Sequence, residues 1–468
     1  MEPLVLPGTL RQESAPIAHR PPAPRARGVE VPLRRRLRRA IVHRALRLLM
    51  ACFHRALRPA ECIGRALRRC SLAHSSAGWH GKIRHAGPAS GRTPEAFARA
   101  RAGDDVLLTG TFYSGNWIAA HVRPLAAADA CRRVLVVSTF PVPAFPKVVP
   151  IYPPCWLQRA IGAVPARLLT FVAVALWHRP NVVGGFHLLV NGLLAALAAR
   201  MIGARALYFC VGGPRELLDG GVWGENRVFG KLDTPDAVIE QQLIRAVAAF
   251  DYVITMGSSA VEFFRRRSVR THFEVIAGGI DVTRFAPGAA APTTDLILVG
   301  RLARVKRIDR FLEAVRIVAD SYPAVKATIV GDGELRAALE AQARDLGLVD
   351  AVRFVGQQAD VERWLRRSKI FVLTSESEGL ALSLMEAMSC GLPAIVSDVG
   401  ELGELVQHGL NGYLVASAKP RDFAHCMLDL LGNEQRRRLF GRAAYHSALR
   451  HHTSVISERW TDILNNGC

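Results

Sequence analysis

The chain has 468 residues, half of them apolar, which is enough for two or three domains with packed cores. Its nine cysteines are scattered, with no CxxC pair, no zinc-type spacing and no secretory signal ahead of them, which excludes a disulfide scaffold and favours a reducing, cytoplasmic compartment. The formal net charge is +21, and about 15 of these charges fall in the first 100 residues. The basic character therefore belongs to one end of the chain.

That end, residues 1–90, is predicted to be a basic extension that is partly disordered or amphipathic. Between residues 33 and 58 arginines interleave with apolar side chains such as Ile41 and Leu48, a pattern typical of a helix on an anionic membrane surface. Two alternatives stay open: nucleic-acid binding, which the pattern disfavours, and a solvated tail, including a stretch upstream of the true translation start. Under each of these three interpretations the extension is expected to be dispensable for catalysis.

Strands and helices alternate from about residue 104, which predicts an α/β fold with a parallel sheet. Strands are expected at 105–110, 133–138 and 181–186. The apolar run 156–177 contains charged residues and a proline, and its uninterrupted part is too short to cross a membrane, so it predicts a buried or interfacial helix.

Polar or glycine-containing turns follow three strands of this half and are candidates for ligand contacts. Gly115 and Asn116 follow the first strand, His187 ends another, and Gly213 and Glu216 come after a third. Each has a plain structural alternative: a tight turn, a satisfied structural histidine, or a loop shaped only by packing. Residues 218–232, rich in glycine, are expected to form a mobile loop over the cleft.

In the second half, a buried strand at 295–300 ends in Gly300 and is followed by Arg301 and Lys306. Two cations that flank a strand-to-helix turn can pair with phosphate oxygens. A basic surface loop is the alternative. The strand before Gly331 also ends in a glycine turn, but the third glycine of a dinucleotide fingerprint is missing, so a nicotinamide cofactor is not supported.

A strand at 370–374 precedes Glu378, and Glu386 lies eight positions later inside the next helix. Ligands of open α/β sheets bind at the carboxyl ends of the strands. One carboxylate in the loop and one in the helix offer two acceptors for sugar hydroxyls. The free N–H groups of the helix start attract phosphate, and the residues leading into that start are Gly379, Leu380, Ala381 and Leu382. A nucleotide-sugar site is therefore predicted, with a solvated helix face as the alternative.

Four stretches in this order resemble the retaining glycosyltransferases of the family-4 type, which have the GT-B fold. They are 275–287, 299–306, 330–334 and 378–386, the last continuing through Gly391 and Pro393 to Asn411 and Gly412. The resemblance is specific over residues 275–415, looser from residue 104, and absent before residue 90. It implies two Rossmann-like domains, here 91–288 for the acceptor and 289–450 for the donor, with a C-terminal helix at 451–468 returning to the first domain.

The resemblance also implies roles for these residues. Arg301 and Lys306 neutralise the diphosphate without a metal, Glu386 holds the ribose, and Glu378 holds the sugar. Gly300, Gly331 and residues 379–382 contact the donor. His187 is the active-site histidine of the acceptor domain, and Gly115, Asn116, Gly213 and Glu216 line the cleft.

The sequence thus predicts a metal-independent, retaining, hexosyl-type transferase with no cofactor beyond its nucleotide-sugar substrate. A saccharide or lipid-linked acceptor in polysaccharide or glycolipid synthesis is expected, with the protein at the inner face of the membrane. The alternatives are a nucleotide-sugar epimerase or hydrolase on the same fold, and a non-catalytic binding module. The sugar, the base, the acceptor, the linkage and the oligomeric state are not fixed by these patterns.

Overall fold

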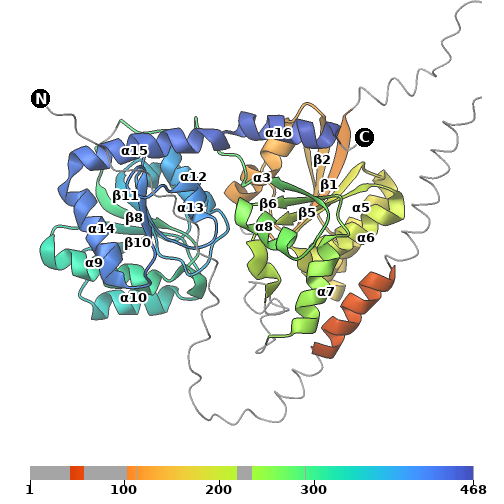
Figure 1. Cartoon of the computed structure of the whole chain (residues 1–468), viewed down its shortest axis with the longest axis horizontal. Helices are drawn as coiled ribbons and strands as arrows, with labels where there is room; N and C mark the ends of the chain where they lie inside the picture. The colour runs from red at the N-terminus through yellow and green to blue at the C-terminus, as the bar shows by residue number, and fades with distance from the viewer. Residues whose placement is uncertain (1–42, 57–102, 113, 219–234, 290, 467–468) are drawn as a thin grey trace, which may run out of the picture.

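The computed structural model describes residues 43–56, 103–112, 114–218, 235–289 and 291–466. Two parallel sheets lie side by side, each covered by helices on both faces (Figure 1). This arrangement confirms the predicted α/β fold of two Rossmann-like domains. Most of the basic extension and of the loop expected at 218–232 lies outside the described residues.

The N-terminal sheet has seven strands within the described residues, in the order β3-β2-β1-β4-β5-β6-β7. They are β1 (Asp104–Thr109), β2 (Cys131–Val137), β3 (Val148–Ile151), β4 (Val182–Phe186), β5 (Arg205–Cys210), β6 (Tyr252–Thr255) and β7 (His272–Val275). Every pairing is parallel, which explains why the strands read as nearly continuous apolar runs.

Helices bury the two faces of this sheet in separate apolar clusters. The elements between its strands are α3 (Gly115–Ala127), α4 (Cys155–Ile161), α5 (Ala163–His178), the irregular turn η1 (Leu188–Gly192), α6 (Leu193–Ile202), η2 (Gly213–Glu216), α7 (Ala237–Val247) and α8 (Ser258–Arg266). Helices α5, α6 and α7 cover one face, and α3 covers the other.

The C-terminal sheet has six parallel strands among the described residues, in the order β10-β9-β8-β11-β12-β13. They are β8 (Thr294–Val299), β9 (Ala327–Val330), β10 (Val352–Phe354), β11 (Ser368–Leu373), β12 (Ala394–Ser397) and β13 (Gly412–Val415). Its helices are η5 (Arg304–Lys306), α9 (Ile308–Ser321), α10 (Arg336–Asp345), α11 (Val361–Leu365), α12 (Leu382–Ser389), α13 (Leu402–Leu405), α14 (Pro420–Gly432), α15 (Glu434–Ala448) and η6 (Leu449–His451). Helices α9, α10 and α14 cover one face, and α11, α12, α13 and α15 cover the other.

Part of the basic extension is built into the N-terminal domain. Residues 43–56 are helical and lie beside α7 (Figure 1). Leu46, Met50 and Phe53, at helical spacing, are buried in the cluster that α5, α6 and α7 share. At the start of α7, Asp236 accepts hydrogen bonds from Arg47 at 2.8 and 3.0 Å and contacts the Nδ1 atom of His43 at 2.8 Å. Over these residues the extension is therefore not separate from the folded domain.

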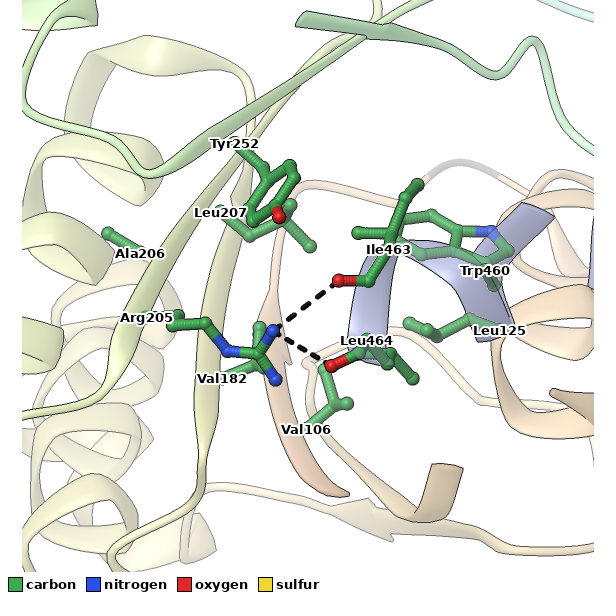
Figure 2. A pocket seen from close by; sticks show the side chains of 10 residues that line it. All are labelled: Val106, Leu125, Val182, Arg205, Ala206, Leu207, Tyr252, Trp460, Ile463 and Leu464. Carbon is green, nitrogen blue, oxygen red and sulfur yellow. Dashed lines mark hydrogen bonds between the residues drawn. The ribbon is translucent and has the colours of Figure 1, made fainter. Parts of the chain in front are cut away.

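The last helix, α16 (Thr453–Asn465), returns to the N-terminal sheet (Figure 1). Trp460, 1% exposed, packs in the same cluster as α3. Arg205 donates to the carbonyl oxygens of Ile463 and Leu464 at the end of α16, at 3.4 and 3.0 Å (Figure 2). The cavity between helix and sheet measures only about 10 Å³, room for at most one water molecule, so it reflects helix packing and is too small for a substrate.

Candidate functional site

Both sheets have a point where the strand order reverses, and the predicted site residues follow strands at these points. The reversal lies between β1 and β4 in the N-terminal sheet and between β8 and β11 in the C-terminal sheet. Ligands of open α/β sheets bind outside the carboxyl ends of the strands at such a point. His187 directly follows β4, while Lys306 and Glu378 come from the segments that follow β8 and β11.

Lys306 and Glu378, 72 residues apart in the chain, form an ion pair. The Nζ atom of Lys306 donates to Oε1 of Glu378 at 2.6 Å, and the hydroxyl of Ser375 donates to the same oxygen at 2.5 Å. The side chains of Lys306 and Glu378 are 18% and 8% exposed. The pair is thus held in a partly desolvated position, where charge–charge interactions are stronger than in bulk water.

Glycines allow the loops around this pair to approach closely. Gly331 has a φ of 142°, and a Cβ atom there would lie 1.9 Å from the carbonyl oxygen of Gly300, so the two predicted donor glycines touch each other. A Cβ atom on Gly379 would lie 2.7 Å from the carbonyl oxygen of Val211, in the loop after β5. The loop that carries Glu378 therefore meets the N-terminal domain directly.

The start of α12 lies next to this contact. Leu380 and Ala381 are buried, and Ala381, the N-cap residue, provides no side-chain hydrogen bond to the helix start at Leu382. An anion can satisfy the N–H groups of such a helix end. Arg301, after β8, has an exposed side chain.

Glu386 lies inside α12 and is 4% exposed. Burial raises the pKa of its carboxyl to about 8; Glu362 adds to this increase and Arg284 opposes it. The carboxyl is therefore mostly protonated at neutral pH, so it can donate one hydrogen bond to a hydroxyl group and accept another.

This pKa leads to a measurable pH dependence of stability. The folded protein keeps the Glu386 proton up to about pH 8, whereas the unfolded chain releases it near its ordinary pKa of 4.5. The stabilisation is therefore greatest in acid and is lost as the pH rises. When the pH is lowered from about 8 to about 6, the free energy of unfolding of wild type should rise by about 2 kcal/mol relative to that of Glu386→Gln. Denaturant titrations of both proteins measure this, and parallel pH profiles would contradict the assignment.

On the opposite side, His187 is held in an unusual backbone conformation by Glu216. His187 has φ 65° and ψ 139°, a region that side chains other than glycine rarely adopt and that is found mainly at functional sites. Its Nδ1 atom lies 3.0 Å from Oε1 of Glu216.

Glu216 also accepts hydrogen bonds from the N–H groups of Leu188 and Gly212 and from the hydroxyl of Tyr208, at 3.2, 2.6 and 2.9 Å. Burial alone would raise the pKa of Glu216, but His187 and these donors together lower it below its ordinary value. The predicted cleft residue Glu216 is therefore the partner that orients His187, and its oxygens are occupied within the domain.

The remaining cleft candidates differ in their surroundings. Asn116, on α3, accepts from Arg284 at 3.1 Å, and Arg284 also donates to Glu362 of the C-terminal domain at 2.9 Å, so Asn116 takes part in a bridge between domains. Gly115 is the first residue of α3, and a Cβ atom at this position would lie 3.2 Å from the side chain of Pro143. Gly213 has a φ of 63°, and a Cβ atom built on it would have no neighbour within 4 Å.

A second bridge between the domains caps helix α8. Its N-cap residue, Gly257, has no side chain. Glu401 accepts from the hydroxyl of Ser259 at 2.6 Å and from the N–H group of Ala260 at 3.2 Å, and Glu404 accepts from the N–H group and hydroxyl of Ser258, both at 2.5 Å. Two carboxylates of the C-terminal domain thus satisfy the helix start of the other domain.

Sequence reasoning missed three residues of this arrangement. Ser375 donates to Glu378 and Tyr208 to Glu216, and Arg284 lies between Asn116 and Glu362. Arg284 was part of a resembling stretch, and Ser375 directly follows a predicted strand, so position in the motif could have indicated both. Nothing in the sequence links Tyr208 to Glu216. Among the described residues no group of three or more His, Cys, Asp or Glu side chains could hold a metal ion.

Comparison with known proteins gives a family match in the second half of the chain. Residues 280–447 match the family described as Glycosyl transferases group 1. The match is confined to this part of the chain, which we call the group 1 domain. It includes Lys306, Glu378 and Glu386, and the matched range begins just after β7.

Curated relatives are similar over parts of the chain. The N-acetyl-alpha-D-glucosaminyl L-malate synthase of Bacillus anthracis is 34% identical over 32% of this chain and 40% of its own length. A D-inositol 3-phosphate glycosyltransferase of Streptomyces avermitilis is 29% identical over 48% and 54%. The amylovoran biosynthesis glycosyltransferase AmsK of Erwinia amylovora is 33% identical over 30% and 36%. The matches thus span about half of these relatives or less.

Solved structures extend the likeness to the N-terminal domain. Anabaena HepE, in complex with UDP and glucose, has a TM-score of 0.61 at 18% identity, over 77% of this chain and 99% of its own. The sucrose-phosphate synthase of Thermosynechococcus elongatus also has a TM-score of 0.61 at 18% identity, over 78% and 98%. At this identity the likeness shows the fold, which is GT-B. The fold and the group 1 domain together support a GT-B glycosyltransferase.

Proposed function

We propose that the chain is a retaining, family-4-type glycosyltransferase that moves a hexosyl-type sugar from a nucleoside diphosphate sugar to a saccharide or lipid-linked acceptor. The observation that carries this proposal is the Lys306–Glu378 pair at the strand reversal of the group 1 domain. The loop that carries Glu378 touches the N-terminal domain at Val211, one residue before Gly212, which donates to Glu216. UDP in the HepE structure supports a nucleotide-sugar donor.

In this mechanism the donor diphosphate binds at the start of α12 and beside Arg301 and Lys306, packed against Gly300, Gly331 and residues 379–382. The two cations stabilise the charge that develops on the leaving phosphate, which makes a metal unnecessary. Glu386 holds the ribose hydroxyls. When the donor binds, the ion pair between Glu378 and Lys306 breaks, and Glu378 orients the sugar. Lys306 then exchanges a carboxylate partner for a phosphate partner.

The transfer proceeds on one face of the sugar. The bond between the anomeric carbon and the leaving phosphate oxygen breaks, the acceptor oxygen bonds to the same face of that carbon, and the acceptor proton passes to the leaving phosphate. His187, oriented by Glu216, lies beside the sugar and stabilises the developing oxocarbenium charge distribution. Gly115, Asn116 and Gly213 are placed on the acceptor side, and no cofactor takes part.

The proposal also covers the pathway and the place in the cell where the enzyme acts. A polysaccharide or glycolipid pathway fits the amylovoran relative, and a cytoplasmic enzyme attached at the inner face of a membrane fits a lipid-linked acceptor. In residues 33–58 the helical part keeps Leu48 and Leu49 exposed, whereas Met50 and Phe53 are buried, so a membrane contact there relies on the outer face with its arginines. Binding to nucleic acid is not part of the proposal.

An assay of sugar transfer tests the proposed function. Nucleotide sugars that copurify with the protein, identified by mass spectrometry, supply the donor, and a panel of saccharide and lipid-linked acceptors supplies the second substrate. We expect a product with retained configuration, formed equally well in EDTA. Release of free sugar or epimerisation without any acceptor would favour an epimerase or hydrolase. Donor binding without turnover across the panel would favour a binding module, and loss of transfer in EDTA would contradict metal independence.

The two glutamates are expected to have separable roles in binding. Glu386→Ala should weaken binding of UDP, because the ribose contact belongs to the product as well as the donor. Glu378→Ala should leave UDP affinity closer to that of wild type and reduce the transfer rate, because its contact is with the sugar. Calorimetry with UDP alone measures the difference. Glu376→Ala, an exposed neighbour on the same loop, is the matched control, and equal losses for Glu378→Ala and Glu386→Ala would show that the roles are misassigned.

A further inference from the structure

Helix α5 is apolar on its outer side as well as on the side that packs against the domain, unlike an ordinary surface helix. Its arginine, Arg167, points inward and is 2% exposed. The guanidinium donates to the hydroxyl of Thr109 at 2.8 Å, to the carbonyl oxygen of Gly110 at 2.6 Å and to the side chain of Asn191 at 2.9 Å. The charge of this helix is therefore used inside the domain.

The outer side of α5 is apolar. Leu169, Ala173 and Leu176 follow at helical spacing and are exposed, and Trp177 at the helix end is 85% exposed. In front of α5, the surface continues over Ile161 and over Trp156 of α4, which is 69% exposed. We call this set the α4–α5 face. A helix that is apolar on both sides is normally buried between other elements or in a membrane.

The stretch of chain that forms this face carries charges of one sign. Residues 130–215 contain no Asp or Glu. The exposed cationic side chains at its two ends are Arg159 in the last turn of α4 and Arg179 directly after α5, which follows His178. Exposed tryptophans with flanking arginines are typical of segments at the boundary between lipid headgroups and acyl chains. Within this stretch of the chain no carboxylate opposes attraction to an anionic surface.

The dimensions favour contact with one leaflet. No helix among the described residues is long and apolar enough to cross a membrane. α5 has 16 residues, about 24 Å at 1.5 Å per residue, and lying flat it can place its outer side chains at the headgroup level. A second copy of the chain on the same face is disfavoured, because it would bring the exposed arginines of both copies together.

We propose that the α4–α5 face is a membrane-docking surface whose occupant is the leaflet of an anionic phospholipid bilayer. The apolar side chains enter the interface, and Arg159 and Arg179 pair with lipid phosphates at its two ends. The face belongs to the described N-terminal domain and is separate from the basic extension, so docking does not depend on residues before 43.

The experiment uses the full chain and vesicles that contain phosphatidylglycerol, with vesicles of phosphatidylcholine alone for comparison. The double variant Trp156→Ser, Trp177→Ser should lower the partition coefficient by about 10-fold or more, since two exposed aromatic anchors are removed. Arg159→Gln and Arg179→Gln should each lower it by roughly 5-fold, only on the anionic vesicles and only at low salt. Leu439→Ser, at an exposed leucine of α15 in the other domain (51% exposed), is the matched control and should bind as wild type does.

Two results would overturn the proposal. If the double tryptophan variant sediments with anionic vesicles as well as wild type does, the binding surface lies elsewhere, for example in the basic extension, which this variant keeps. If wild type dimerises without vesicles and the variant does not, the occupant is a second copy. A cooperative unfolding transition like that of wild type shows that each variant is folded, and vesicle binding is measured without any transfer reaction, so failure here is distinct from failure of the proposed activity.

Discussion

Replacing Lys306 with alanine is expected to reduce sugar transfer by about 100-fold or more, the usual cost of removing one electrostatic donor at a developing charge. The ammonium group lies 2.6 Å from Glu378 and is only partly exposed, so water screens its charge little once a phosphate replaces the carboxylate as its partner. Arg301→Ala should have an effect of the same direction. Steady-state rates under saturating donor measure the loss.

The control is Arg304→Ala. Arg304 is an exposed arginine in the same short helix, η5, and should leave the rate close to that of wild type. A double variant of Lys306 and Glu378 should lose less than the product of the two single effects, because the residues act as one unit. Near-normal rates for both Lys306→Ala and Arg301→Ala would refute the diphosphate assignment.

The second large effect is expected at His187. Asparagine tolerates a positive φ better than most residues, so His187→Asn removes the imidazole while it keeps the backbone close to its present shape. We expect the transfer rate to fall by about 100-fold, within the range typical of a positioned polar group at a reacting centre. The affinity for UDP should hardly change, because the proposed nucleotide contacts belong to the other domain.

Glu216→Gln tests the orienting role of the carboxylate. The variant keeps the shape but leaves one amide oxygen for the donors of Leu188, Gly212 and Tyr208. The rate should fall and its pH profile should shift, which a purely structural role would not cause. His425→Asn, at an exposed histidine of α14, is the control. Full activity of His187→Asn would place the reacting sugar away from this residue.

The sequence indicated the fold because its strands are apolar runs that end in glycine or a polar turn. The runs before Gly300 and Gly331, for example, are β8 and β9, and a parallel sheet requires that strands be apolar on both faces. Placement of Lys306 and Glu378 at one sheet edge followed from the same rule. Their ion pair did not, since it depends on side-chain geometry across 72 residues.

Other features depend on contacts that a local pattern does not encode. The positive φ of His187 is fixed by Glu216 and by the kinked turn after β4. The basic extension was interpreted from its charge, as a membrane-surface helix or a tail. The spacing of Leu46, Met50 and Phe53, however, has the period of a helix that packs on a core. Asn116 was predicted to contact an acceptor from its position alone, and its partner, Arg284, comes from the segment between the domains.

The return of α16 has a consequence for the order in which the protein is made. The N-terminal domain takes its core from three separate stretches, 43–56, 104–275 and 453–465, whereas the group 1 domain is continuous from β8 to α15. On the ribosome, the N-terminal domain must wait for Trp460, which is synthesised after the whole group 1 domain, before the sheet face that α3 shares with α16 is fully covered. Of the two domains, the one that begins first is therefore completed last, and the apolar surface that α16 will cover stays open to chaperones and to aggregation until this helix emerges.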